Sequence, residues 1–267
     1  MVFIPPRRKI RRLEAYLLED LSQEELRGVK RAFELGACSR FNPLLELNIQ
    51  KAPEEYLNQP HSYIRIKETE AGRQGPFVLI DKQAVSKGAV WYIAKFATED
   101  DLEYGQAEST SVLWKILVKI DCLPLTWINY DIGNTSIVED LGNCGVDYPV
   151  KEDFAQPEVY CCGGLDMVKQ QYHQPVWVTA VPGEFEESTG DELRKNFLPR
   201  PEKLARLKEG VAEDAGLVNQ WTIPTKARSV TMPDGSVKEF PEGSVVLQLL
   251  WNPDFPWPEY KWPEGSR

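Results

Sequence analysis

The pattern of apolar and polar positions predicts two helices at the start of the chain. Leucines recur at helical spacing through residues 11–21, and an apolar face of the same period follows. Ser22 and Glu25 have the spacing of a capping box, in which two side chains satisfy free amides of a helix start. Gly36 suits the left-handed residue that closes many helices. The sequence therefore predicts a helical hairpin over residues 11–35.

Short apolar runs follow this hairpin and predict strands. In the first half of the chain these runs are Leu44–Ile49, Tyr63–Lys67, Phe77–Ile80, Ala89–Ala97 and Leu125–Tyr130. The short connection between the third and fourth runs favours an antiparallel pair. Ser111–Ile120 instead has apolar residues at i, i+1, i+4, i+5 and i+8, which predicts a helix with one buried stripe. Ser136 and Glu139 repeat the capping spacing before a short helix over residues 137–141.

A polar stretch that contains proline, residues 147–156, is the predicted domain boundary. It divides an α+β domain, residues 1–150, from residues 151–267, which form a β-rich domain or continue the first one. The predicted elements beyond it are strands at Glu158–Cys162, Val176–Val181 and Ser244–Trp251, a helical turn at Leu165–Tyr172, a helix from Pro201 to before Gly216, and a hairpin turning at Pro233–Gly235. The predicted fold class is α+β, with an antiparallel or mixed sheet flanked by helices.

The tail, residues 252–267, is dense in proline and aromatic residues. Such a segment can lie along the apolar surface of its own domain, or it can dock into a partner. We favour packing on its own domain.

Charge and cysteine content restrict the class of protein. The net charge of −10 argues against binding to nucleic acid or to an anionic membrane, because both require positive surface. The basic run Arg7, Arg8, Lys9, Arg11 and Arg12 is a local exception, either a solvated helix cap or a patch for an import receptor or acidic partner. No apolar stretch is long enough for a membrane helix, and the N-terminus lacks a secretory signal. The five cysteines are scattered, which favours reduced thiols in a soluble cytoplasmic protein.

The sequence lacks the common cofactor and metal motifs. It contains no phosphate-binding glycine loop, no dinucleotide fingerprint and no Cys-x-x-Cys pair. His61 and His173 are its two histidines, too few for a metal site of three histidines. We therefore expect neither a metal nor a cofactor, and the oligomeric state is left open.

The strongest candidate site is the segment Asn129–Asn134. A predicted strand ends here at a glycine turn before a helix start, a geometry that presents polar groups to a ligand. On this hypothesis Asp131 and Tyr130 are catalytic, and Trp127, Asn129 and Asn134 bind substrate. The alternative is a connection whose Asp and Asn side chains satisfy only their own backbone.

A second candidate is a thiol–imidazole pair. Cys161 or Cys162, beside a glycine pair, is a candidate reactive thiol, and His173 is a candidate general base. Buried cysteines more commonly act as small apolar residues, and a histidine before a proline is more commonly a surface or capping residue.

Residues Leu125–Asp140, LTWINYDIGNTSIVED, resemble the closing signature of an uncharacterised domain family of fungi and actinobacteria. The resemblance extends back through Phe77–Asp81 and covers the first half of the chain. It implies a strand that runs into an Asn-containing turn and a short acidic helix. The family has no established activity, so the resemblance assigns no catalytic residue.

Two hypotheses of function follow. The first is a protein that handles a small molecule in an aromatic pocket, such as a cofactor-independent isomerase, cyclase or lyase. The second is a non-catalytic interaction or regulatory protein that uses its basic N-terminus and its Pro/Trp-rich tail. A deep apolar pocket near residues 127–134 favours the first hypothesis.

Overall fold

The computed structural model describes residues 2–6 and 10–267 of this α+β chain, which divides into two compact units. Residues 10–168 and 259–267 form one of them, which we call the sheet unit. Residues 1–9 and 169–258 form the other, which we call the small unit. The division falls after Val168, and the end of the chain returns to the sheet unit.

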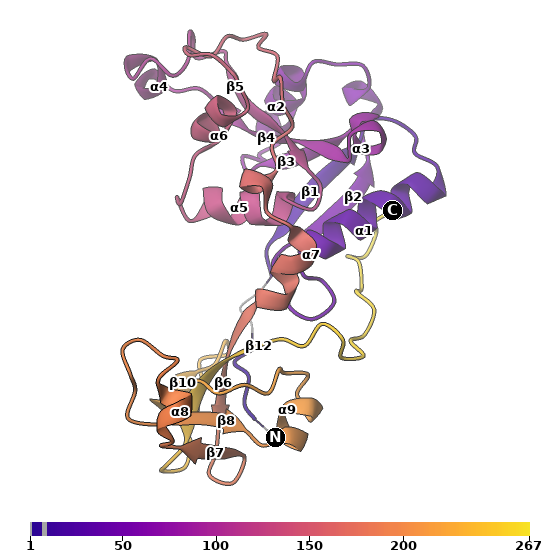
Figure 1. Cartoon of the computed structure of the whole chain (residues 1–267). Coiled ribbons are helices and arrows are strands. Elements are labelled where there is room, and N and C mark those ends of the chain that lie inside the picture. Colours follow the sequence, from indigo (N-terminus) through magenta and orange to yellow (C-terminus); the bar gives the residue numbers. More distant parts are fainter. Residues whose placement is uncertain (1, 7–9) are drawn as a thin grey trace. The chain divides into compact units, whose positions relative to one another are not determined.

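The elements up to the division belong to the sheet unit (Figure 1). They are β1 (Arg12–Leu17), α1 (Gln23–Gly36), β2 (Glu46–Lys51), the 3₁₀ turn Glu54–Tyr56, α2 (His61–Glu70), β3 (Phe77–Ile80), α3 (Gln83–Ser86), β4 (Ala89–Phe96), α4 (Glu99–Glu103), β5 (Leu113–Lys119), α5 (Leu123–Asp131), α6 (Ile137–Asn143), the 3₁₀ turn Cys162–Gly164, and α7 (Met167–Gln170), whose last two residues cross the division.

The sheet unit is built on a five-stranded mixed sheet of order β2-β1-β3-β4-β5. β1 is parallel to both β2 and β3, and Ala15 at its centre is paired with Ile49 and Val78. Parallel neighbours require crossover connections, which α1 and α2 provide. β3, β4 and β5 then follow as an antiparallel meander, which confirms the predicted antiparallel pair.

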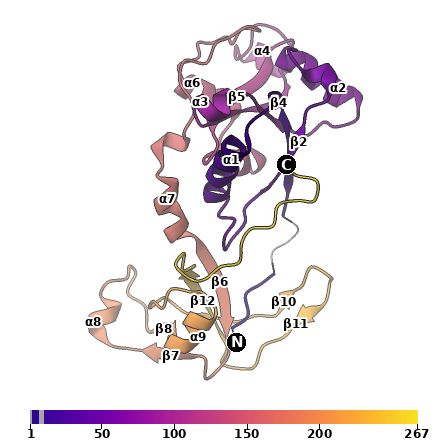
Figure 2. The same ribbon diagram turned by 90° about the vertical axis from the view of Figure 1, so that its right-hand side faces the viewer.

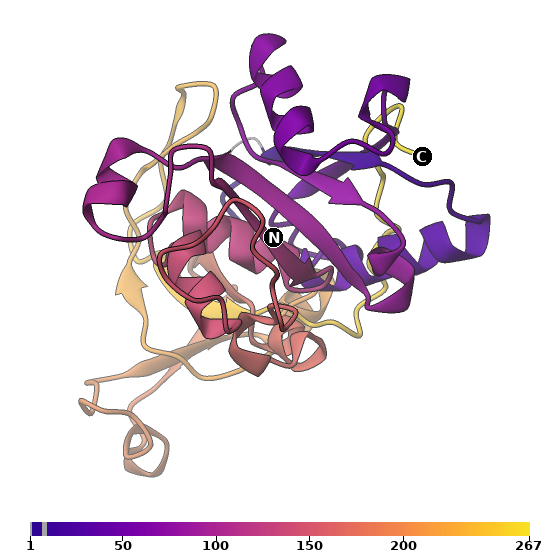
Figure 3. The same cartoon turned by 90° about the horizontal axis from the view of Figure 1, so that it is seen from above.

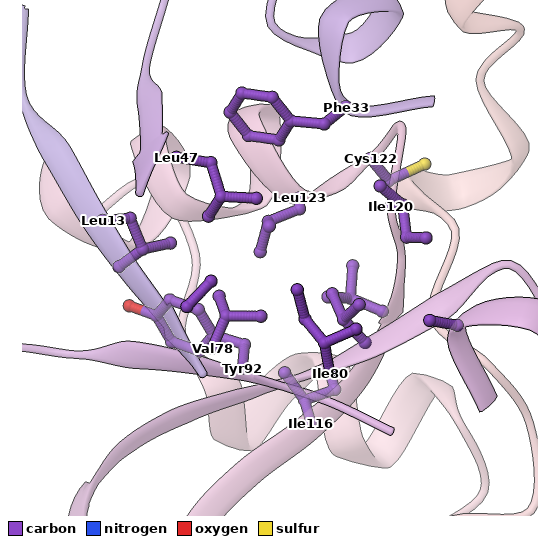
Figure 4. Packing of buried hydrophobic residues seen from close by; sticks show 14 of the residues in the cluster. Leu13, Phe33, Leu47, Val78, Ile80, Tyr92, Ile116, Ile120, Cys122 and Leu123 are labelled. Carbon is purple, nitrogen blue, oxygen red and sulfur yellow. The ribbon is translucent and has the colours of Figure 1, made fainter. Parts of the chain in front are cut away.

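Helices cover both faces of this sheet (Figure 3). On one face, side chains of the strands pack with Phe33 of α1 and Leu123 of α5 in one continuous core (Figure 4). On the other face, Ile64 of α2 packs with Tyr16 and Phe77. The central strands are therefore buried on both sides, as β3 is over its whole length.

The first helix of the predicted hairpin is wrong. The second is confirmed, but Gly36 is its last helical residue and not the left-handed residue that closes it. Residues 12–17 form β1, because a central strand buries apolar side chains on both faces and so loses its alternation. In α1 the amide of Glu25 donates to the Ser22 hydroxyl at 3.2 Å, and the Ser22 amide donates to the Glu25 carboxylate at 2.8 Å. The capping box therefore forms as predicted.

Three further predictions in this unit are wrong for related reasons. Residues 111–120 contain β5 instead of a helix, since its side chains are buried on both faces and imitate a wide apolar stripe. Residues 63–67 lie in α2, where Ile64 is buried and Ile66 is 45% exposed. Residues 125–130 lie in α5 instead of a strand, also against the strand that the family resemblance implies. The short helix α6 is confirmed, with the Glu139 amide donating to Ser136 at 3.1 Å.

The small unit is rich in short strands. Its elements are the 3₁₀ turn Gln171–His173, β6 (Pro175–Ala180), β7 (Phe185–Ser188), α8 (Asp191–Arg194), β8 (Leu204–Leu207), α9 (Glu209–Asp214), β9 (Thr225–Lys226), β10 (Val230–Thr231), β11 (Val237–Lys238) and β12 (Val245–Leu250). β6, β12 and β9 form an antiparallel sheet, and the pairs β7–β8 and β10–β11 are hairpin-like.

Some predictions for the second half hold and others fail. The hairpin at residues 233–235, the strand predicted over Val176–Val181, which is β6, and the last strand, β12, are confirmed. The helix predicted from Pro201 is wrong, because residues 204–207 pair with β7 and α9 starts only at Glu209. The strand predicted over residues 158–162 is reduced to a bridge between Tyr160 and Val118.

The aromatic tail packs on its own domain only in part, because residues 252–258 belong to the small unit whereas residues 259–267 belong to the sheet unit. Trp257 contacts Trp251 in the small unit, with ring centroids 5.3 Å apart. In the sheet unit, Trp262 lies 5.8 Å from Phe33, and the last amide of the chain donates to the Ile49 carbonyl of β2 at 2.8 Å (Figure 2).

Of the basic run, residues 7–9 lie outside the described part of the chain. Arg11 and Arg12 are described, and each forms an ion pair, with Asp131 and Glu46 respectively.

Candidate functional site

α5 and the turn that ends it carry most of the predicted site residues. The helix begins with a proline in its first turn, where the missing amide costs no hydrogen bond. It ends at Gly133, whose φ of 69° is the left-handed conformation that glycine adopts without strain. The Asn134 amide donates to the Asn129 carbonyl at 2.9 Å and the Gly133 amide to the Tyr130 carbonyl at 3.3 Å, which is a Schellman motif.

Helical spacing divides the predicted residues between two faces. Residues four apart share a face of a helix, so Trp127 lies with Asp131. Tyr130 and Asn134 instead line a cavity beyond the end of the helix. In the predicted strand Leu125–Tyr130, Trp127 and Asn129 would share a face, so this error also alters the composition of the site.

Trp127 and Asp131 are engaged with Arg11. The Arg11 guanidinium lies over the Trp127 ring, 5.6 Å from its centroid, and forms an ion pair with the Asp131 carboxylate. Neither Trp127 nor Asp131 lines the cavity near Tyr130. Asn129 receives a weak hydrogen bond of 3.4 Å from the Asn134 side chain. Asn129 is therefore held by a contact at the helix end, whereas Trp127 and Asp131 are held by Arg11, which is distant in sequence.

The cavity has a volume of about 510 Å³ and is bounded by β4, the end of α5 and the start of α6. Tyr92 and Tyr130 form its aromatic wall, with ring centroids 5.6 Å apart and ring planes inclined at 59°. Asn134, Thr135, Ser136 and Glu139 form its polar rim, where the Thr135 hydroxyl donates to the Glu139 carboxylate at 3.0 Å. The volume falls in the range typical of sites for small organic molecules.

A buried carboxylate supports the tyrosine wall. The Tyr130 hydroxyl donates to the Asp140 carboxylate at 2.8 Å, and Asp140 is only 3% exposed. Burial raises the pKa of Asp140, an effect that hydrogen bonds from Tyr130 and Tyr160 partly offset. Burial and the nearby Asp140 raise the pKa of Tyr130 in turn. Tyr130 is therefore a neutral phenol whose proton is already committed to Asp140, while its oxygen can accept a hydrogen bond from a ligand.

The predicted thiol–imidazole pair is divided between the units. Cys162 is buried in the sheet unit, where its sulfur lies 3.3 Å from the Thr126 hydroxyl. A hydrogen bond between the free thiols of Cys122 and Cys162, together with burial, raises the pKa of Cys122. Cys161 is exposed in the same unit, whereas His173 is exposed in the small unit. Neither unit by itself combines the two groups.

Sequence reasoning missed Tyr92, Asp140 and Glu139. Asp140 lies in a short segment of acidic residues, and the sequence gives no sign that this carboxylate is buried while its neighbour Glu139 is not. Tyr92 lies in a correctly predicted strand, but only the packing of α5 across the sheet places its ring beside Tyr130.

Comparisons with known proteins identify no relative. No family model matches the chain, and neither a curated protein nor a solved structure is similar to it. Within residues 2–6 and 10–267, no three His, Cys, Asp or Glu side chains lie close enough together to hold a metal ion. The helices in this described part are all too short or too polar to span a bilayer.

Proposed function

We propose that the sheet unit binds a small, uncharged molecule in the cavity between β4, α5 and α6. The observation that carries this proposal is Tyr130, which lines the cavity and whose hydroxyl is held by the buried Asp140. A phenol whose proton is already donated offers only its oxygen, so it selects a ligand with a hydrogen-bond donor. The aromatic wall favours a flat or cyclic ligand body, for which stacked or edge contacts are available.

Charge argues against an anionic ligand in this cavity. Glu139 lies on its rim and Asp140 lies beneath its wall. A carboxylate or phosphate on the ligand would face both groups without a cation among the lining residues. A hydroxylated ring or a cyclic amide satisfies the acceptors and introduces no repulsion.

If the protein is an enzyme, Glu139 is the group placed to act as a general base. Its carboxylate lines the cavity and could take a proton from a carbon or hydroxyl of the ligand and return it elsewhere, as an isomerase requires. Tyr130 would then orient the ligand. This assignment replaces Asp131, which pairs with Arg11, as the proposed acid–base residue. The resemblance of the first half of the chain to an uncharacterised domain family remains a proposal, and it assigns no role to any residue.

The proposal is tested by ligand-observed NMR with phenol, catechol, cyclohexanol and myo-inositol, and with benzoate as the charged comparison. We expect a neutral ring alcohol to bind and Tyr130→Phe, which removes the acceptor, to weaken binding about tenfold, the effect of one lost hydrogen bond of about 1.4 kcal/mol. The control Tyr104→Phe alters a side chain that is 76% exposed. Tighter binding of benzoate than of phenol would contradict the proposal. Equal binding of the neutral ligand to Tyr130→Phe and Tyr104→Phe would contradict it as well.

A further inference from the structure

A second cavity lies at the start of α2. It has a volume of about 530 Å³ and is lined by residues of the segment 59–62, of β5 and of the loop that contains Glu152 and Asp153. None of the residues of the first cavity lines it. The proposed function makes no use of this cavity.

Lys115 of β5 is held in the wall of this cavity without an anionic partner. Its ammonium lies 5.3 Å from the centroid of Trp91 and 5.4 Å from that of Phe154, so two rings restrict its stem and lower its exposure. In the described part of the chain, no ion pair involves Lys115. Burial lowers the pKa of Lys115. An ammonium in this setting is stabilised by an anion that replaces lost water.

The start of α2 adds unused donors on the same cavity. Its N-cap residue is Pro60, which has no side-chain acceptor, and its first turn contains no acidic residue. Among the described residues, no hydrogen bond uses the amides of His61, Ser62 or Tyr63. Free amides and the helix dipole favour a negative charge at this position. His61 lines the cavity with a ring that packs edge-on to Trp91 at 5.2 Å and has a buried, unpartnered Nδ1.

Two carboxylates give the cavity a second, opposite charge. Glu152 accepts a hydrogen bond from Ser109 at 2.7 Å through one oxygen, and within the described residues neither Glu152 nor Asp153 forms an ion pair. They do not neutralise Lys115 directly, since no N–O distance of 4 Å or less joins them to it. The cavity therefore carries unpaired charges of both signs. A dianion such as phosphate would meet two carboxylates for one lysine, whereas a zwitterion matches both.

We propose that this cavity binds a small zwitterion, such as an amino acid, with its carboxylate at Lys115 and the start of α2 and its cationic group at Glu152 and Asp153. The volume accommodates a molecule of amino-acid size. The site is separate from the cavity at Tyr130, so this proposal does not depend on the proposed function.

The test is calorimetric titration of the full chain with glycine, 4-aminobutyrate and lysine. The matched probes butyrate, butylammonium and inorganic phosphate each lack one of the two charges. We expect at least one zwitterion to bind tenfold or more tightly than every single-charge probe. We also expect it to shift the NMR signals of the His61–Tyr63 amides. The proposal would be overturned if none of the three zwitterions binds at a concentration of about 10 mM, which is on the order of the weakest affinities that matter for metabolites. It would also be overturned if a single-charge probe binds as tightly as the zwitterions or more tightly.

Variants locate the site. Lys115→Met keeps a linear stem between Trp91 and Phe154 and removes the charge, and Glu152→Gln with Asp153→Asn removes the opposite charges. Each is expected to weaken zwitterion binding at least tenfold. The control Lys119→Gln changes a lysine of the same strand that bonds to the Lys87 carbonyl, and it should leave binding unchanged. If Lys115→Met has a wild-type melting temperature and binds as tightly as the wild type, the site is elsewhere and the proposal is wrong.

Discussion

Single buried residues decide the electrostatics of the sheet unit. Asp140 is held by tyrosine hydroxyls, and Glu68, which is 2% exposed, accepts from Tyr16 at 3.0 Å and Tyr56 at 2.5 Å. Both are single carboxylates in regions of the sequence where acidic residues are common, so composition does not distinguish them from exposed ones. Some of these hydrogen bonds join separate elements, as the bond from Tyr16 to Glu68 does, so they depend on the fold.

His61 is expected to make stability depend on pH. Burial and the nearby Lys115 lower the pKa of His61 to about 4, from about 6.5 in an unfolded chain. The unfolded state therefore binds more protons between these values, and stability is lost as pH falls from about 6.5 to about 4. The loss attributable to this group is about 3 kcal/mol at pH 4.

Urea unfolding at pH 7 and pH 4 measures this contribution. The wild type should lose about 3 kcal/mol more than His61→Gln over this interval, because the carboxylates contribute to both proteins and cancel in the difference. An equal loss in the two proteins would show that the imidazole is not buried in a neutral form.

At the scale of elements, the end of α1 packs too closely against its neighbour for a side chain, whereas the middle of α1 has free space. A Cβ on Gly36 would lie 1.7 Å from the Asp121 carbonyl oxygen, so the helix end and the chain before α5 approach with no room for a side chain. A Cβ on Gly28, in the same helix, meets no atom within 4 Å. The same residue type therefore has a packing role at one position and none at the other.

These two glycines are a matched pair for substitution. Gly28→Ala should raise the free energy of unfolding by about 1 kcal/mol, since alanine loses less backbone entropy in a helix. Gly36→Ala should lower it by more than about 2 kcal/mol through overpacking. Chemical denaturation of both variants measures the effects. A neutral Gly36→Ala would show that α1 and the segment before α5 do not pack as closely as the structure has them.

At the scale of the whole molecule, the chain alternates between the units: residues 2–6 belong to the small unit, residues 10–168 to the sheet unit, residues 169–258 to the small unit and residues 259–267 to the sheet unit. The returning segment, residues 259–267, is tied to α1 and β2 by contacts that span most of the sequence. The indole of Trp262 donates to the Glu34 carboxylate at 2.7 Å, and the amide of Ile49 donates to the Ser266 hydroxyl at 3.2 Å. The last residues are therefore part of the sheet unit.

Trp262→Ala is expected to lower the stability of the sheet unit by about 2 kcal/mol, from lost ring contact with Phe33 and a lost hydrogen bond. Amide hydrogen exchange in α1 should accelerate accordingly, by a factor of about 30. The control Tyr104→Ala removes a side chain that is 76% exposed and should leave this exchange unchanged. Equal rates of amide hydrogen exchange in α1 for the two variants would show that the tail does not pack against this helix.

Local features of the chain were predictable where a short-range interaction decides them. The capping box at Ser22, the N-cap hydrogen bond at Ser136 and the Pro-Asp-Gly hairpin each depend on residues within a few positions, and all three are present, although the reciprocal half of the Ser136 box is not formed. The apolar runs of β3, β4 and β12 were also recognised, because a strand of four to eight apolar residues is typical of a buried sheet.

Burial on both faces removes the alternation of apolar and polar residues that marks a strand in the sequence. For such segments only the tertiary structure decided which are strands and which are helices. β1 and β5 are covered on both faces and imitate helices, and α5 was predicted as a strand. The α+β class could be predicted, since it requires only that the sequence contains both helix patterns and strand patterns. The candidate site could be predicted only in part. Tyr130 and Asn134 stand out in the sequence and line the cavity, whereas the cavity position of Tyr92 and the bond from Asp140 to Tyr130 depend on contacts of the folded sheet unit.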